Sequence, residues 1–298
     1  MRTIFTHLRP DLDAVSSVWF YKRFVLAKDE EAKLTFVPAN WNGAEMQPGD
    51  VALDIEAGGK GEKGAKLSDG RVMSCFAGLV ESHGTDAQYA ILRPVVEFVD
   101  AQDSTGDAFT TLLSGVAECP CCFLPFKPRR EQIPASIRIG SLESMFRVME
   151  RLAKEDYHET VRRFSEILDA IYESGLDLQE AEKEAKLVEM IGPVAFVNSM
   201  SKNPHLHPKV FAKRDARVIV RLDASNLCVL RRDTEKMNLG KIVRPFVEKN
   251  APDELVGDEK WFFHPAGYLA ARGTLKAPAK ALSRVDARAL AQHIANSI

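Results

Sequence analysis

The chain has 298 residues, of which 45% are hydrophobic and 28% are charged, and its 40 basic and 42 acidic residues leave a net charge of −2. This composition is typical of a globular protein of two domains, without the global basic excess of many nucleic-acid-binding proteins. No stretch approaches the roughly 20 apolar residues that a membrane helix requires, and the first residues do not form a signal peptide, so we expect a cytoplasmic protein that makes no membrane contact.

The first hundred residues alternate between short apolar strands and helices with amphipathic or apolar spacing. The predicted strands are 2–6, 34–37 and 51–55, and the predicted helices are 13–25, 73–83, 88–101 and one that begins near Ser104. Because strands that alternate with helices form parallel sheets, this half predicts an α/β domain with a parallel sheet.

The middle of the chain changes character. Residues 119–140 are rich in proline and basic side chains and are predicted to form a loop. Residues 141–191 have an apolar and a charged face, which predicts amphipathic helices separated by a break at Gly175. We therefore expect a parallel-sheet domain over 1–125, a loop and helical connector over 126–191, and a smaller α/β domain over 192–298.

The last third is rich in strands. Residues 216–222 and 226–230 flank the turn DAS and predict a hairpin. The remaining predicted elements are strands over 194–197 and 261–264, a turn at PAGY and a helix from about Pro278. The segment SKNPHLHPK places His205 and His207 between prolines, which favours an exposed loop over a metal site.

The five cysteines do not form the even, spaced set of a secreted disulfide protein. Cys119, Cys121 and Cys122 form a CPCC cluster that supplies three of the four ligands of a tetrahedral zinc site. With no second paired half in the sequence, reduced thiols on a loop are the favoured interpretation.

Candidate metal ligands follow the predicted strands. In THLRPDLDAVSS, the side chains of His7, Asp11 and Asp13 come directly after the first strand, and Asp54 closes the third. Asp100 ends a later apolar run, with Asp103 one helical turn beyond. Parallel sheets bind ligands at the carboxyl ends of their strands, and carboxylates with an imidazole suit Mn²⁺ or Mg²⁺. The alternative is that Asp11 and Asp13 turn the chain and cap the following helix.

These segments resemble the motifs of the DHH phosphoesterase superfamily. HLRPDLDAVSS at 7–17 is similar to the first motif, LDIEAGG at 53–59 to the second, and VDAQD at 99–103 to a later aspartate motif. FFHPAGYLAARGTLKAPAKAL is similar to the substrate-binding segment of the melanocyte-proliferating-gene type of DHH-like hydrolase. The resemblance implies a parallel-sheet domain joined to a smaller C-terminal domain.

The resemblance also implies roles for individual residues. His7 and Asp11 would hold one Mn²⁺ or Mg²⁺ ion, Asp13 a second, Asp54 would bridge them, and Asp100 would complete the first site. His264 and Gly267, or Arg272, would meet the phosphate or base of the substrate. The implied activity is hydrolysis of a phosphodiester in a short oligonucleotide or small nucleotide by metal-activated water, and a homodimer is compatible with it.

The chain departs from the family in lacking the Asp-His-His triplet, where the sequence is GGKGEKGAKLSDGRVMSC. Glu62 or Asp69 could serve as oxygen ligands instead, and Lys60, Lys63 or Lys66 could bind phosphate in a glycine-rich anion-binding loop. The site could accordingly bind metal differently, bind one ion, or have lost catalysis. The alternative function is therefore a degenerate DHH-like protein that binds a nucleotide or anion without hydrolysis.

Overall fold

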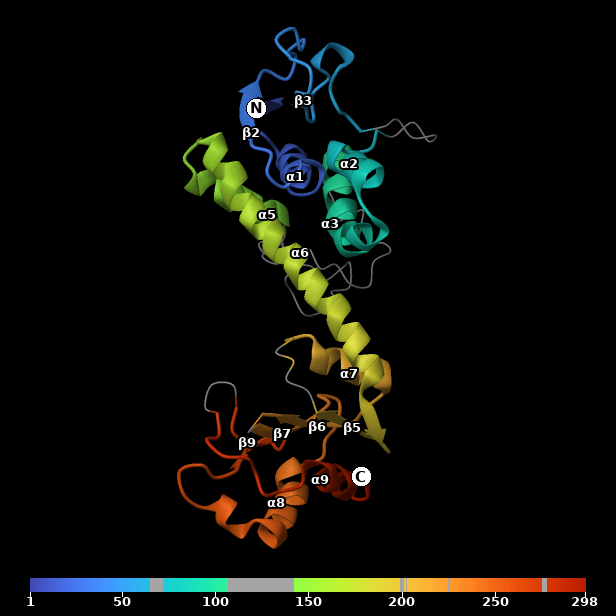
Figure 1. Ribbon diagram of the computed structural model, residues 1–298, viewed down its shortest axis with the longest axis vertical. Helices are drawn as coiled ribbons and strands as arrows, with labels where there is room; N and C mark the ends of the chain where they lie inside the picture. Colours follow the sequence, from blue (N-terminus) through green and yellow to red (C-terminus); the bar gives the residue numbers. More distant parts are fainter. Residues whose placement is uncertain (65–71, 107–141, 199–200, 202, 225, 275–277) are drawn as a thin grey trace. The chain divides into compact units, whose positions relative to one another are not determined.

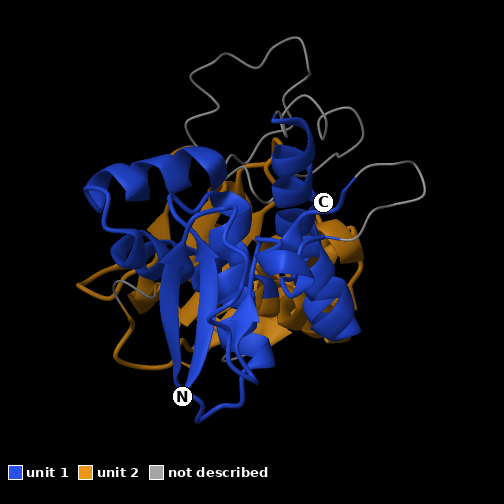
Figure 2. Ribbon diagram, turned by 90° about the horizontal axis from the view of Figure 1, so that it is seen from above, with its two compact units in different colours: residues 1–175 blue, residues 176–298 orange. Residues whose placement is uncertain are grey.

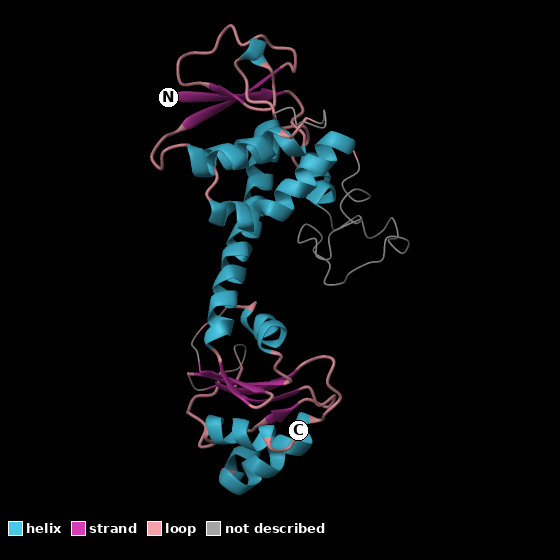
Figure 3. Ribbon diagram, turned by 90° about the vertical axis from the view of Figure 1, so that its right-hand side faces the viewer, coloured by secondary structure: helices cyan, strands magenta, loops and turns pink. Residues whose placement is uncertain are grey.

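The computed structural model describes residues 1–64, 72–106, 142–198, 201, 203–224, 226–274 and 278–298 (Figure 1). These residues form two compact units, Met1–Gly175 and Leu176–Ile298, which Figure 2 draws in two colours. Each unit combines helices with a β-sheet, which confirms the predicted α/β class (Figure 3). Several predicted features lie outside the described residues: Lys66, Asp69, the CPCC cluster, the 119–140 loop and the continuation of the helix from Ser104.

The first unit contains a parallel sheet of three strands in the order β2-β1-β3, as the sequence predicts. The strands are β1 (Arg2–His7), β2 (Ala32–Val37) and β3 (Val51–Ala52). β3 is shorter than the predicted strand because Asp54 adopts a positive φ of 56°, which is incompatible with extended backbone. The carboxyl ends of β1 and β3 therefore lie side by side and lead into His7 and Asp54.

Helices cover one face of this sheet (Figure 3). They are α1 (Leu12–Phe20), α2 (Cys75–His83), α3 (Asp86–Thr105), α5 (Leu142–Leu152) and the first part of α6 (Tyr157–Leu187). Ile4 and Leu34 of the sheet share a core with Phe20, Phe76 and Phe98 of the helices. This core fixes α1 and α2 beside the end of β1, where the candidate ligands lie.

The helix α6 corrects the predicted break at Gly175, because it runs through that residue without interruption. A Cβ atom on Gly175 would overlap with Cγ2 of Ile91 in α3, so the glycine permits close packing of two helices. The interruption lies earlier, between α5 and α6. None of the helices in the described ranges has the length and hydropathy to cross a membrane.

The second unit contains a mixed sheet of six strands in the order β4-β5-β6-β7-β9-β8. β5 and β6 are parallel and the other pairs are antiparallel. The predicted hairpin is present, with Asp223 paired to Asn226 across its turn. The strands are β4 (Glu189–Ile191), β5 (Val194–Asn198), β6 (Val218–Asp223), β7 (Asn226–Arg231), β8 (Phe262–Phe263) and β9 (Leu269–Arg272).

Helices pack on both faces of the second sheet. They are α7 (Leu206–Arg214) on one face, and α8 (Leu239–Asn250) and α9 (Ala287–Ala295) on the other. The predicted loop is present at His205, which lies in the turn before α7, but it is wrong for His207, which lies in the first turn of α7, where Pro208 is tolerated. The C-terminal helix begins later than Pro278, because the side chain of Asp286 caps it by accepting from the N–H of Ala289.

Candidate metal centre

The first turn of the chain brings the side chains of His7 and Asp11 together at the carboxyl end of β1. His7 is the last residue of β1, and Asp11 is the N-cap of α1, whose Oδ1 accepts from the N–H of Ala14 at 3.0 Å. The capping alternative is therefore correct for Asp11. Each carboxylate oxygen has two lone pairs, so Asp11 can cap the helix and still bind a cation. Asp11 remains half exposed, and its Oδ1 lies 3.9 Å from Nε2 of His7.

Asp54 reaches the same point from β3. Its backbone is in the left-handed region, which aspartate tolerates better than most residues, and its N–H donates to the carbonyl oxygen of Glu62 at 3.0 Å. This turn directs the carboxylate toward β1, where Oδ2 lies 3.1 Å from Nε2 of His7. Left-handed non-glycine residues often occur at functional sites.

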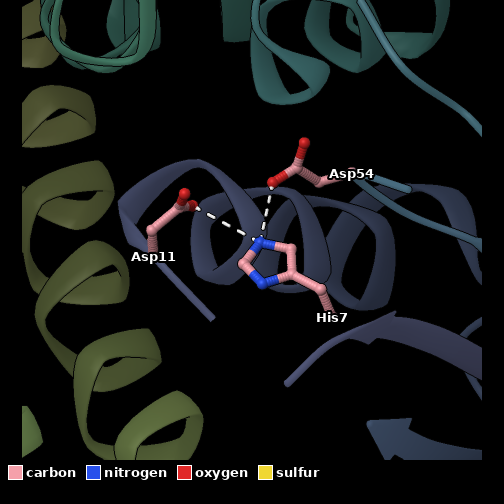
Figure 4. Close-up of side chains that lie close together, drawn as sticks. All are labelled: His7, Asp11 and Asp54. Atoms are coloured by element: carbon pink, nitrogen blue, oxygen red, sulfur yellow. Dashed lines mark hydrogen bonds and ion pairs between the residues drawn. The ribbon is translucent and has the colours of Figure 1, made fainter. Parts of the chain in front are cut away.

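His7, Asp11 and Asp54 thus form one cluster of three side chains (Figure 4). One potential ligand atom from each lies within 4.8 Å of the other two. Ligands about 2.1 Å from an octahedral Mg²⁺ ion lie about 3 to 4.2 Å from one another. The two distances from Nε2, 3.1 Å to Asp54 and 3.9 Å to Asp11, fall within this range.

The ring of His7 has the orientation that a metal ligand needs. Its Nδ1–H donates to the carbonyl oxygen of Leu8 at 3.0 Å, and a carbonyl can only accept, so this nitrogen carries the proton. Nε2, which faces the carboxylates, is then the nitrogen that can bind a cation. A backbone carbonyl on the far nitrogen is the usual support of metal-binding histidines.

Without an ion, the imidazole is protonated. Burial lowers the pKa of His7, but the hydrogen bond to Asp54, the hydrogen bond to Leu8 and the charges of Asp54 and Asp11 outweigh it and raise this pKa to about 9. The cluster therefore attracts a cation, and at neutral pH a proton fills the position in which a metal ion would bind.

Asp13 and Asp100, two further predicted ligands, take part in a different interaction. Both carboxylate oxygens of Asp13 accept from backbone N–H groups of α2, Oδ2 from Cys75 and Oδ1 from Phe76, each at 2.8 Å. Asp100 lies within α3, in agreement with the helix predicted over 88–101, so the expectation that all the candidate ligands follow strands is wrong for this residue. Its Oδ1 accepts from the N–H of Ser74 at 2.8 Å.

Asp103 is a carboxylate that the predicted ligand set omitted. Partial burial and the charges of Asp54 and Asp11 raise the pKa of Asp103 to about 6, so it belongs to the electrostatic environment of the cluster. The charge of Lys63 opposes this shift. The signal in the sequence was its spacing of three from Asp100, which places both on neighbouring positions of one helix face.

The predicted phosphate-binding lysines lie near this edge of the sheet. Nζ of Lys60 is 3.5 Å from the carbonyl oxygen of Gly43, and Lys63 is close enough to affect the titration of Asp103. Glu62 contributes its backbone to the turn around Asp54 and is not part of the three-residue cluster.

The predicted substrate residues of the second unit are engaged locally. Nδ1 of His264 accepts from the N–H of Ala266 at 3.1 Å, and its ring lies 4.1 Å from that of Tyr268. Gly267 has a φ of 73° and shapes this turn. Arg272 is 6% exposed, donates to the carbonyl oxygen of Ala281 at 2.6 Å and pairs with Glu254 and Glu259.

A cavity of about 350 Å³ occupies the α7 face of the second sheet. Its described lining includes His207, Arg221, Cys228 and Leu230, and the three predicted substrate residues do not contribute to it. Burial and the charge of Arg221 lower the pKa of His207 to about 4, so His207 is neutral at physiological pH.

No protein-family model matches this chain, and no curated protein does. Solved structures give matches of low similarity. Exonuclease RecJ bound to manganese is 12% identical with a TM-score of 0.35, over 99% of this chain and 90% of that one. RecJ of Thermus thermophilus with Mg²⁺ is 13% identical with a TM-score of 0.31, over 99% of this chain and 50% of that one. An uncharacterized protein of Helicobacter pylori G27 is 10% identical with a TM-score of 0.23, over 99% of both chains. These values assign no family.

Proposed function

We propose that this protein is a divalent-metal-dependent phosphoesterase that hydrolyses a phosphodiester of a short oligonucleotide or small nucleotide. The observation that carries the proposal is the convergence of His7, Asp11 and Asp54, with the Nδ1–H of His7 fixed on a carbonyl so that Nε2 faces two carboxylates. A nitrogen with two carboxylate oxygens suits Mn²⁺ or Mg²⁺. The resemblance of residues 7–17 to the first DHH motif supplies the reaction class.

The chain's own residues have distinct tasks in this proposal. His7, Asp11 and Asp54 hold the ion, which when bound would acidify a water molecule and neutralise charge on a phosphoryl oxygen. Asp103 is an exposed carboxylate whose pKa is raised by desolvation and by the charges of Asp54 and Asp11, and in this proposal it would accept a proton close to neutral pH. Lys60 and Lys63, whose segment follows Asp54, would attract an anionic substrate through their positive charges.

The test is hydrolysis of bis-p-nitrophenyl phosphate, dinucleotides and cyclic dinucleotides after reconstitution with Mn²⁺. The Asp11→Asn variant removes a charged ligand and keeps an equally good N-cap for α1, so loss of turnover would report on the metal and not on the helix. Asp29→Asn, in an exposed loop of the same unit, is the matched control. Equal Mn²⁺-dependent turnover in Asp11→Asn and the wild type would contradict the proposal.

A second candidate function is binding of a nucleotide or anion without hydrolysis. One observation favours it: Asp13 and Asp100, which the DHH resemblance assigns to metal, accept hydrogen bonds from backbone amides. Saturable nucleotide binding measured by calorimetry, with no product from any substrate of the panel at any Mn²⁺ concentration, would support this function over the first.

A further inference from the structure

The start of α2 presents three consecutive backbone N–H groups to two carboxylates. The N–H of Ser74 donates to Asp100, and those of Cys75 and Phe76 donate to the two oxygens of Asp13. The first N–H groups of a helix have no partner within the helix, and together they carry about half a positive charge. Asp13 is 2% exposed, and burial and the charge of Asp54 raise the pKa of its carboxyl group, a shift that the two hydrogen bonds from α2 oppose only in part.

The direction of Asp13 follows from its position in α1. Asp11 is the N-cap and Asp13 lies two residues further, and side chains two residues apart on a helix do not face one another. The side chain of Asp11 consequently points to His7 while that of Asp13 points to α2. Within the described residues, His7, Asp11 and Asp54 are the one group of three that meets the geometry of a metal site.

We propose that the N-terminus of α2 takes the place of a second metal ion, so that the chain binds one divalent ion on His7, Asp11 and Asp54 while Asp13 and Asp100 anchor α2. The inference rests on the proposed function because it takes the first cluster to be a metal site. It deepens that proposal by limiting the centre to one ion and by making Asp13 and Asp100 positioning residues. A helix N-terminus stabilises anionic groups, but unlike a metal ion it cannot acidify water.

The first experiment counts ions on the wild-type full chain. Titration with Mn²⁺ by calorimetry should give one ion per chain, and electron paramagnetic resonance should show the hyperfine pattern of an isolated Mn²⁺ ion. Two ions per chain with a spin-coupled spectrum would overturn the inference and leave the proposed function standing. If the titration detects no bound ion, both the proposed function and the inference of one ion per chain are contradicted.

Variants separate the two sets of carboxylates. Asp13→Asn replaces one acceptor oxygen with an amide donor that faces a backbone N–H, so it should lower the melting temperature by roughly 3–8 °C and still bind one Mn²⁺ ion. Asp54→Asn should lose roughly tenfold or more in Mn²⁺ affinity. A loss of bound Mn²⁺ in Asp13→Asn equal to that in Asp54→Asn would overturn the inference.

A third variant guards against failure of Asp13→Asn to fold. Asp100→Asn perturbs the hydrogen bond from the N–H of Ser74 at a less buried position, so it should retain the ion with a smaller fall in melting temperature. Asp29→Asn, exposed and remote from α2 in sequence, should change neither quantity. Unchanged melting temperatures in both Asp13→Asn and Asp100→Asn would also overturn the anchoring role.

Discussion

Two regions that the sequence predicts to bind metal or substrate use their polar residues differently. At the edge of the first sheet, His7, Asp11 and Asp54 come from three points of the chain and face one another. In the segment from Phe262 to Arg272 of the second unit, His264 interacts with its own turn, and Arg272 is enclosed by Glu254 and Glu259. A residue type that matches a motif is thus insufficient evidence for a site. Side chains from separate elements that converge on one point are the better indicator.

The strongest effect should come from the converging side chains. Asp54→Asn removes one charged ligand, while asparagine accepts the left-handed backbone of this position. Mn²⁺-dependent turnover should fall by roughly 10³-fold, because the position of the ion depends on this carboxylate. Steady-state kinetics at saturating Mn²⁺ measures the effect, and a fall of less than about threefold would remove Asp54 from the centre.

The next largest effect is expected on the stability of the second unit, where Arg272 is buried. Arg272→Met leaves the buried carboxylate of Glu254 without its cation, so the second unit should lose about 3 kcal/mol of unfolding free energy. Mn²⁺ affinity should stay unchanged, because the metal cluster belongs entirely to the first unit. Denaturant unfolding and calorimetry measure the two quantities. A substrate role for Arg272 predicts instead a raised KM with little change in stability.

The pH dependence of metal binding tests the first unit alone. Because the pKa of His7 is raised to about 9, a Mn²⁺ ion must displace a proton at neutral pH. Affinity should rise roughly tenfold for each pH unit from 7 to 9 and then level off. Calorimetry in buffers of different ionisation enthalpy should detect about one proton released for each ion bound. A pH-independent affinity would show that Nε2 does not bind the ion.

The same pKa has a consequence for the metal-free protein. A pKa above the usual value of 6.5 means that protonated His7 stabilises the fold, and this contribution is complete below pH 6.5. It should be lost as the pH rises through about 9. His7→Gln removes the titrating group, so its stability should not decline over this interval, and an identical decline in both proteins would assign the effect to another group.

The weakest effect concerns the turn of the second unit. Gly267 has a positive φ, and a Cβ atom there would lie 2.7 Å from Cγ of Asn238. Gly267→Ala should therefore cost about 1–2 kcal/mol of unfolding free energy, with Mn²⁺ binding unchanged. Chemical denaturation measures it. A stability equal to that of the wild type would mean that the turn adapts easily and that the glycine serves another purpose.

The secondary structure of the first unit and the parallel pairing of its strands could be predicted from the sequence. Apolar strands alternating with helices allow few arrangements, and the three predicted strands pair in parallel, although the third is confined to Val51–Ala52. Proximity of His7 and Asp11 also followed from the sequence, because a short turn separates the end of a strand from the cap of a helix. Asp54 could be placed at the same edge because β3 is parallel to β1.

The partners of the remaining side chains depend on the packed fold. Asp13 contacts Cys75 and Phe76, which are distant in the sequence, and Asp100 contacts Ser74. Gly175 also packs against a distant residue, Ile91 of α3. The sequence predicted a break at Gly175, but the helix α6 continues through it. The spacing of apolar and polar residues determines where strands, turns and helices form. The partner of a buried carboxylate depends instead on which helix end the packed core brings beside it.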